Sequence, residues 1–219
     1  MNKYDLVLYD LDGTLWDSVP LIMESLKKAY DIVLGGTDRT DADLMSFIGR
    51  PLNEVYAMHD DETRERLIKA YLDYNCAKLE ENAVPVFPGV YDFLSKIRTL
   101  GAKQGIVTSK RESSAMITID FLDLGKYFDT MVFREATERA KPHGDPLIEA
   151  ARRLGISDMG RVLYVGDAVP DILSAKDAGC DFALVGWTKM DKEALKCLEP
   201  HYIVEVPSSL PCIIEGTEL

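Results

Sequence analysis

The chain has 219 residues, of which 47% are hydrophobic and 28% are charged, an ordinary composition for a globular protein. Its net charge of −12 argues against nucleic acid as a partner, because phosphate backbones are bound by basic surfaces. No hydrophobic run approaches the roughly 20 residues of a membrane span, and the first residues lack the pattern of a signal peptide. The four cysteines are scattered without metal-binding spacing, as in proteins with reduced thiols. We therefore expect a cytoplasmic protein that binds neither nucleic acid nor membrane, and the oligomeric state stays open.

The segment 4–15, YDLVLYDLDGTL, carries the first chemical signal. Its hydrophobic run Leu6–Tyr9 predicts a short buried strand, which is followed by Asp10, Asp12 and a Gly-Thr turn. Ligands of open α/β sheets bind beyond the carboxyl ends of the strands. Two carboxylates this close repel each other unless a cation lies between them, and Mg²⁺ suits such oxygen ligands.

Residues 17 to 82 show helical periodicity and no convincing strand. Asp17 or Ser18 is expected to cap the first helix, with Pro20 in its first turn. Further helices are expected over 41–47, from Pro51, and from about Glu62. This block predicts a four-helix insertion after the first strand.

The Pro-rich segment 84–89 predicts a hinge, after which strands and helices alternate as in a parallel sheet with right-handed crossovers. The expected strands are 103–108, 131–133, 161–165, 181–185 and, at an edge, 202–204; the expected helices are 90–100, 112–122, 145–154, 171–178 and 208–214. The fold class is therefore α/β. A Rossmann-like parallel sheet core flanked by helices is expected for residues 1–16 and 84–219, with an inserted all-helical domain over 17–83.

Two later segments place polar side chains where strands of this sheet should end. Thr108 and Ser109 follow the second strand, where hydroxyl and backbone N–H groups can hold a phosphoryl oxygen. Lys141 lies in a loop rich in Pro and Gly before a helix, where it can direct a fixed positive charge at a phosphoryl group. The neighbouring His143 is expected to be a solvated loop residue rather than an acid or base.

The segment 162–171, VLYVGDAVPD, is the second strong signal. A buried strand ends in Gly166-Asp167, and Asp171 follows four residues later at the start of a helix. Two more carboxylates at the same edge again suit a cation. For Asp171, capping the helix and acting at a metal site are both open.

Four segments in order, DLDGTL, GIVTSK, KPHGDP and GDAVPD, resemble the four motifs of the haloacid dehalogenase-like (HAD) hydrolases, and they span nearly the whole chain. The resemblance implies that Asp10 attacks phosphorus and becomes an aspartyl-phosphate, while Asp12 acts as general acid and then base. This division is chemically reasonable, because an ionised carboxylate is a nucleophile and a second one, held protonated, can meet the leaving oxygen. The family also implies Mg²⁺ held by Asp10, the backbone carbonyl of Asp12 and Asp167, with Asp171 as a ligand or an orienting residue.

The resemblance extends to the remaining positions, with one departure. Thr108 and Lys141 would stabilise the transferred phosphoryl group, with Ser109 as a further substrate contact. The third motif is commonly Lys-Pro-x-Pro, and Gly144 replaces its second proline, which is expected to loosen the loop. The helical insertion matches a cap that closes over the site, and Arg50 in its Gly-Arg-Pro loop is a candidate substrate ligand.

The sequence looks most like the phosphoglycolate phosphatase-like subfamily. We therefore expect a Mg²⁺-dependent phosphatase acting on a small phosphorylated metabolite. A phosphosugar mutase similar to β-phosphoglucomutase is an alternative, although Ile22 stands where those enzymes commonly carry a histidine. Pyrophosphatase, 5′-nucleotidase and a catalytically silent binding protein on the same fold remain further alternatives. Dehalogenase chemistry is disfavoured because that branch usually lacks counterparts of Asp12 and Asp167.

Overall fold

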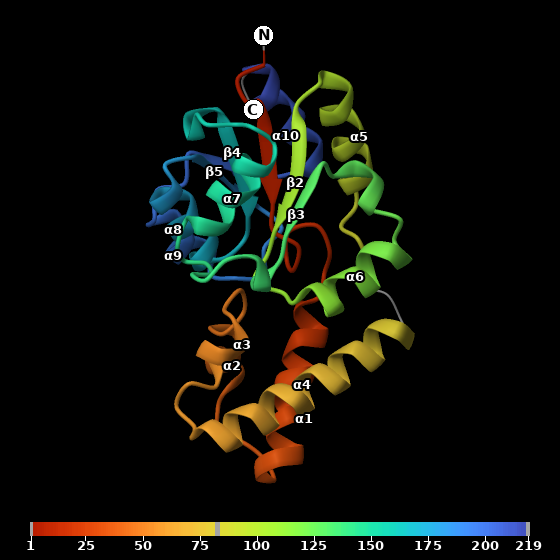
Figure 1. The fold of residues 1–219 in the computed structure, drawn as a ribbon, viewed down its shortest axis with the longest axis vertical. Coiled ribbons are helices and arrows are strands. Elements are labelled where there is room, and N and C mark those ends of the chain that lie inside the picture. The colour runs from red at the N-terminus through yellow and green to blue at the C-terminus, as the bar shows by residue number, and fades with distance from the viewer. Residues whose placement is uncertain (1, 82–83, 218–219) are drawn as a thin grey trace.

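The computed structural model describes residues 2–81 and 84–217, and it shows a sheet-containing part joined to a helical part (Figure 1). The sheet has six parallel strands in the order β3-β2-β1-β4-β5-β6. Their bounds are Leu6–Tyr9 (β1), Lys103–Val107 (β2), Thr130–Val132 (β3), Val162–Gly166 (β4), Asp181–Val185 (β5) and Tyr202–Val204 (β6). The expected parallel sheet, with 202–204 at its edge, is therefore confirmed.

Strand β1 lies at the centre of the sheet and is buried along its whole length. Leu6 is in register with Lys103 of β2 and with Val162 of β4, so these three strands end close together. Side chains of a strand alternate between the two faces of a sheet, which is why Val7 and Tyr9 join one hydrophobic cluster while Leu6 and Leu8 join the other.

Helices cover both faces of the sheet, as expected for a Rossmann-like core. One cluster is covered by α5 (Val90–Leu100), α6 (Glu112–Phe121) and α10 (Leu210–Glu215), and the other by α7 (Asp145–Arg153), α8 (Val169–Ala178) and α9 (Lys192–Lys196). The short helix α9 was not predicted from the sequence, because five residues are too few to show helical periodicity. Asp191 caps this helix by accepting hydrogen bonds from two backbone N–H groups.

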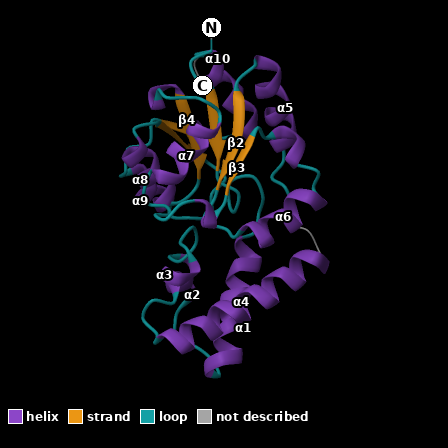
Figure 2. Cartoon of the chain, in the orientation of Figure 1, coloured by secondary structure: helices purple, strands orange, loops and turns teal. Residues whose placement is uncertain are grey.

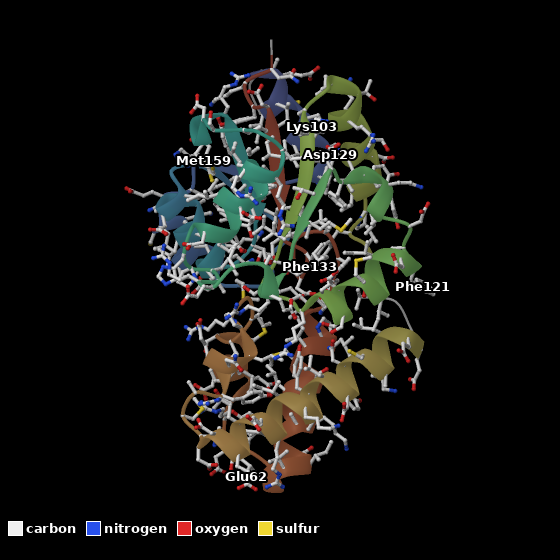
Figure 3. All side chains as sticks on the ribbon, viewed as in Figure 1. Glu62, Lys103, Phe121, Asp129, Phe133 and Met159 are labelled. Atoms are coloured by element: carbon white, nitrogen blue, oxygen red, sulfur yellow. The ribbon has the colours of Figure 1, made fainter. Side chains whose placement is uncertain are left out.

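The helical part lies beyond the carboxyl ends of the strands (Figure 2). It consists of α1 (Val19–Leu34), α2 (Asp41–Met45), α3 (Leu52–Val55) and α4 (Asp61–Glu81), which share a third hydrophobic cluster. Figure 3 shows the direction of the sheet: Lys103 begins β2 at the far end, whereas Phe133, just after β3, faces the helical part. The predicted boundary between the helical domain and the sheet-containing domain, at residue 83, stays a prediction, since residues 82–83 lie outside the described residues.

The chain passes between the two parts through two segments that run side by side. The Asp17 N–H donates to the Pro85 carbonyl at 2.8 Å, and the Phe87 N–H donates to the Leu15 carbonyl at 3.1 Å. Leu79, near the end of α4, belongs to a hydrophobic cluster of the sheet, and α4 packs against α6. The two parts are thus joined by hydrogen bonds between the connecting segments and by the packing of α4 on α6.

The start of α1 differs from the expectation that Asp17 or Ser18 caps it with a side chain. Ser18 occupies the N-cap position, but its side chain makes no capping hydrogen bond, because the hydroxyl instead donates to Asp12. Asp17 forms an ion pair with Lys189 at 2.6 Å. None of the helices within 2–81 and 84–217 combines the length and the hydrophobicity required to cross a bilayer.

Candidate active site

The nucleophile candidate Asp10 is fixed directly at the end of β1. Its N–H donates to the Val165 carbonyl at 2.9 Å, so the residue is still held by the sheet, and it is only 2% exposed. The chain then turns sharply, with the Leu15 N–H bonded to the Leu11 carbonyl at 2.9 Å. Gly13 has a φ of +83° within this turn. A Cβ there would lie 2.3 Å from Asp167 Oδ2, so only glycine fits.

Lys141 reaches Asp10 from the loop before α7, and Asp171 holds it there. The ammonium group lies 3.0 Å from Asp10 Oδ1 and 2.7 Å from Asp171 Oδ1, and all three side chains are almost fully buried. The Tyr164 hydroxyl accepts from Lys141 at 3.0 Å. Asp171 Oδ2 accepts from the backbone N–H groups of Asp167 and Ala168, each at 3.1 Å. Both Asp171 oxygens are therefore already engaged within the protein.

Asp167 follows β4 and faces the same space as Asp10. Its carboxylate accepts a hydrogen bond from the Thr188 hydroxyl at 3.1 Å. A second, longer contact of 3.4 Å comes from the Thr14 hydroxyl. Asp10, Asp167 and Asp171 each have a carboxylate oxygen within 4.8 Å of the other two, which is the spacing of ligands around one metal ion.

The electrostatics of this cluster suit a bound cation. Burial raises the pKa of Asp10 to about 7 despite the lowering effect of Lys141, and burial together with Asp171 and Asp10 raises the pKa of Asp167 well above its ordinary range. Apart from its ion pair with Lys141, Asp10 Oδ1 has no hydrogen-bond partner among the described residues. When all three buried carboxyl groups are ionised, one buried ammonium group leaves excess negative charge, which a divalent cation bound by oxygen would offset.

The Asp12 carboxylate makes its contacts with residues outside this cluster, and these contacts favour its ionised form rather than the protonated form expected for a general acid. Its carboxylate accepts from Trp16 Nε1 at 2.8 Å and from the Ser18 hydroxyl at 2.6 Å. Lys110 Nζ lies 3.3 Å away. Burial alone would raise the pKa of Asp12, but Lys110 and these hydrogen bonds lower it below its ordinary value, so the group is ionised.

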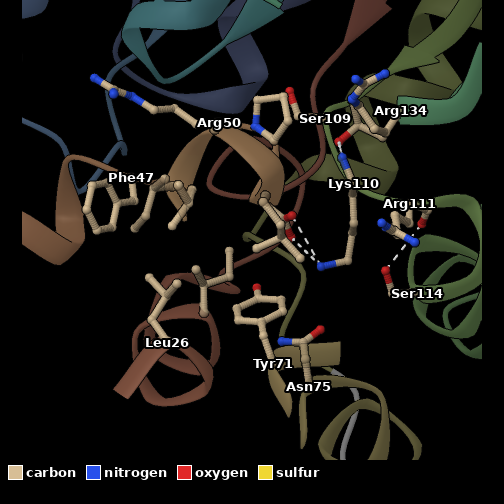
Figure 4. A pocket seen from close by; sticks show the side chains of 18 of the residues that line it. Leu26, Phe47, Arg50, Tyr71, Asn75, Ser109, Lys110, Arg111, Ser114 and Arg134 are labelled. Carbon is tan, nitrogen blue, oxygen red and sulfur yellow. Dashed lines mark hydrogen bonds and ion pairs between the residues drawn. The ribbon is translucent and has the colours of Figure 1, made fainter. Parts of the chain in front are cut away.

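A pocket between the helical part and the sheet opens onto Asp10 and Asp12 (Figure 4). Thr108 lines it and is 4% exposed, and its hydroxyl oxygen accepts from the Lys110 N–H at 3.2 Å. The Ser109 hydroxyl is buried without a hydrogen-bond partner in the described part of the chain. Both hydroxyl groups predicted from the second motif are thus brought to the pocket.

The pocket is cationic, although the protein carries a net charge of −12. Its lining includes the four basic residues Arg50, Lys110, Arg111 and Arg134. Arg50, the predicted cap ligand, is exposed at the rim, and Figure 4 shows its side chain extending away from Lys110. The basic residues that line the pocket can hold a second anionic group of a substrate beside the reacting phosphate.

The loop that carries Lys141 is tightly packed, contrary to the expectation that Gly144 loosens it. The Gly144 N–H donates to Asp177 at 2.7 Å, and a Cβ at this position would lie 2.5 Å from the Ala178 nitrogen. Proline at 144 would lack the N–H and clash with α8, which explains the departure from the usual motif. His143 is exposed, as expected, and its carbonyl accepts from the Ser174 hydroxyl.

Several residues of the site were missed from the sequence. Lys110 directly follows Thr108 and Ser109, so its position after a strand could have indicated it. Thr188 follows β5 by three residues and could have been found by the same rule. The contacts of Tyr164, Trp16 and Ser18 required the three-dimensional structure, because an aromatic strand residue or a serine before a helix is usually structural.

Comparison with known proteins agrees with this architecture. The family model "Haloacid dehalogenase-like hydrolase" matches residues 7–185. The pyrophosphatase PpaX of Bacillus velezensis is 33% identical over 209 residues, covering 95% of each chain. A solved structure of a predicted phosphatase from Clostridium acetobutylicum superposes with a TM-score of 0.85 at 28% identity, covering 97% of this chain and 99% of the other. A hydrolase from Pseudomonas syringae, at 23% identity and a TM-score of 0.86 over 98% and 100% of the two chains, shares the fold.

The chain therefore belongs to the haloacid dehalogenase-like hydrolases. Within this family it is an enzyme of the phosphatase type.

Proposed function

We propose that this phosphatase transfers the phosphoryl group of a small substrate to Asp10 and then to water. The observation that carries the proposal is the position of Asp10, which is buried at the end of the central strand with Lys141 3.0 Å away. Lys141 offsets the charge of Asp10 and of an approaching phosphate, so the two anions can meet.

The metal that suits the carboxylate cluster is Mg²⁺. Asp10 and Asp167 would hold it, together with the backbone carbonyl of Asp12. It would neutralise negative charge on the phosphoryl oxygens when bound. Asp171, although close enough to be a ligand, is assigned to holding Lys141, because both of its oxygens already accept hydrogen bonds.

The reaction follows from the charge states of the side chains. Asp10 attacks phosphorus in line, the bond between phosphorus and the leaving oxygen breaks, and an aspartyl-phosphate forms. An alcohol leaves with a proton from the protonated form of Asp12, whereas phosphate can leave as an anion. Asp12, ionised in the resting protein, is suited to take a proton from the water that attacks this intermediate. Thr108 contributes its hydroxyl group to the phosphoryl oxygens, since its backbone N–H already donates to the Val132 carbonyl, and Ser109 contributes its hydroxyl and backbone N–H groups. The helical block 17–83 acts as a cap that closes over these steps and excludes water.

Two substrate classes are consistent with the basic residues of the pocket. The first is a small phosphomonoester such as phosphoglycolate, whose carboxylate would bind the basic lining of the pocket. The second is pyrophosphate, whose second phosphate would bind the same basic residues and would leave with less help from an acid than an alcohol needs. The name of the relative from Bacillus velezensis supports the second class.

Hydrolysis of a panel of phosphate compounds, with Mg²⁺ and then with EDTA, tests the proposal. The panel contains phosphoglycolate, pyrophosphate, nucleoside monophosphates and hexose phosphates. We expect metal-dependent turnover of phosphoglycolate or pyrophosphate above the others. Absence of any turnover by the folded, Mg²⁺-supplemented protein would contradict a phosphatase and favour the mutase or the silent binding protein. The free cysteines fit the cytoplasmic location, which stays a prediction.

A further inference from the structure

Asn75 lines the pocket and carries a buried, unpaired acceptor. It lies on α4, lines the pocket that also contains Asp10 and Asp12, and is only 1% exposed. Its Oδ1 has no hydrogen-bond partner among the described residues. Figure 4 shows Asn75 next to Tyr71, one helical turn away. A buried amide oxygen that has lost water without gaining a donor is unfavourable, so this atom is suited to a ligand that brings a donor.

The orientation of the Asn75 amide is fixed by Ser25. The Ser25 hydroxyl donates its single proton to the Leu21 carbonyl at 2.7 Å. Towards Asn75 it can therefore only accept, and it accepts from Nδ2 at 3.0 Å. The amide nitrogen consequently faces Ser25, which leaves the oxygen as the free group.

We propose that Asn75 Oδ1 accepts a hydrogen bond from the leaving group of the substrate, so that the enzyme prefers phosphate compounds whose leaving group carries an O–H. This inference rests on the proposed function and narrows its substrate class to compounds whose leaving group carries an O–H, which leaves out phosphoglycolate, whose leaving group carries an ionised carboxylate. A site built around a buried hydrogen-bonding group rejects analogues that lack the matching group, because the buried group then stays unpaired.

The chemistry around Asn75 agrees with a small polar leaving group. Lys110 and Tyr71 line the same pocket, and they supply donors where Asn75 supplies an acceptor. Ile22 and Leu26 of α1 form an apolar wall. Two kinds of substrate share the required O–H: an ester of an alcohol with a second hydroxyl group, and pyrophosphate in its protonated form.

The test compares two esters that differ by one hydroxyl group, 2-hydroxyethyl phosphate and ethyl phosphate, with pyrophosphate as a third substrate. For the wild-type protein with Mg²⁺, we expect kcat/KM to favour the hydroxylated ester by about tenfold or more. Asn75→Leu should bring this ratio to near one. Ser25→Ala, which frees the amide to turn, should lower the ratio in part, so the proposal can be tested even if Asn75→Leu does not fold. Tyr74→Phe, on the same helix, removes a hydroxyl that contacts Glu24 and should leave the ratio unchanged.

The measured ratios decide whether the proposal holds and which substrate supplies the O–H. A wild-type ratio near one, or equal losses for both esters in Asn75→Leu, would overturn the proposal. If pyrophosphate is the source of the O–H, its kcat/KM should fall in Asn75→Leu at pH 6 and much less at pH 9, where the proton is lost. A loss restricted to 2-hydroxyethyl phosphate would identify a hydroxylated alcohol instead. If the wild-type protein hydrolyses phosphoglycolate but none of these three compounds, this inference fails while the proposed function stands. If it hydrolyses no phosphate compound of either test, the proposed function itself fails.

Discussion

Lys141 and Asp171 form a buried ion pair, with 2.7 Å between Nζ and Oδ1, and this pair places the Lys141 ammonium group beside Asp10. Asp171 is itself held by two backbone N–H groups at the start of α8, so its position is fixed by the fold. Isolated charges are costly to bury, and each member of this cluster is tolerated because the others are present.

Replacing Lys141 with methionine should therefore damage both stability and catalysis. The change leaves Asp10 and Asp171 buried without their counter-charge, and losing one partner of a buried ion pair costs about 3–5 kcal/mol. We expect a clearly lower free energy of unfolding in denaturant titrations and no measurable phosphatase turnover. Lys96→Met, at an exposed position on α5, should change neither quantity. Wild-type stability in Lys141→Met would show that the cluster is not held by this charge.

The stability of the metal-free protein should fall as the pH rises from about 4 to 7. The pKa of Asp10 is raised from 3.8 to about 7 in the folded protein, so the folded state binds more protons than the unfolded state in this window. Asp167 acts in the same direction, whereas Asp12, whose pKa is lowered, affects stability only at lower pH.

Mg²⁺ should remove this loss of stability, because it favours the ionised carboxylates. The measurement is the melting temperature across this pH range, with EDTA and with Mg²⁺. We expect a decline with pH in EDTA and an increasing stabilisation by Mg²⁺ towards pH 7. A melting temperature that rises with pH in EDTA would contradict the raised pKa values.

Thr188 should be required for tight binding of Mg²⁺. Its hydroxyl orients the Asp167 carboxylate, and losing such an orienting partner typically weakens metal affinity by about tenfold or more. Thr188→Val should show this loss in calorimetric titrations with Mg²⁺, and Thr188→Ser should restore the affinity. Equal Mg²⁺ affinity of Thr188→Val and the wild-type protein would show that Thr188 does not contribute to metal binding.

Gly13→Ala should inactivate the enzyme, whereas Gly35→Ala should not. Both glycines have a left-handed backbone, with φ of +83° and +77°, so alanine costs each about 1–2 kcal/mol. A Cβ at Gly13 would also collide with the Asp167 carboxylate, while a Cβ at Gly35 would meet open space. Turnover and melting temperature of the two variants separate strain from the collision. Comparable activity in both would show that the close approach of Gly13 and Asp167 is unimportant.

The sequence predicts the order and type of most elements because hydrophobic runs and helical stripes alternate strongly along the chain. It also predicts that Asp10, Thr108 and Asp167 meet, since the carboxyl ends of parallel strands lie at one edge. It could not show that Asp12 is ionised, because that depends on Lys110, Trp16 and the diverted Ser18 hydroxyl. Contacts between distant segments, such as Gly144 with α8 or Asn75 with Ser25, arise only from tertiary packing.

The most direct test of the account is to trap the phosphoenzyme. The protein is mixed with its best substrate and Mg²⁺, quenched in acid within milliseconds, digested and analysed by mass spectrometry. We expect an acyl-phosphate on the peptide that contains Asp10, and we expect it to be absent from Asp10→Asn, which should also lose turnover by a factor of about a thousand or more. Phosphate on another residue, or rapid turnover by Asp10→Asn, would contradict Asp10 as the nucleophile.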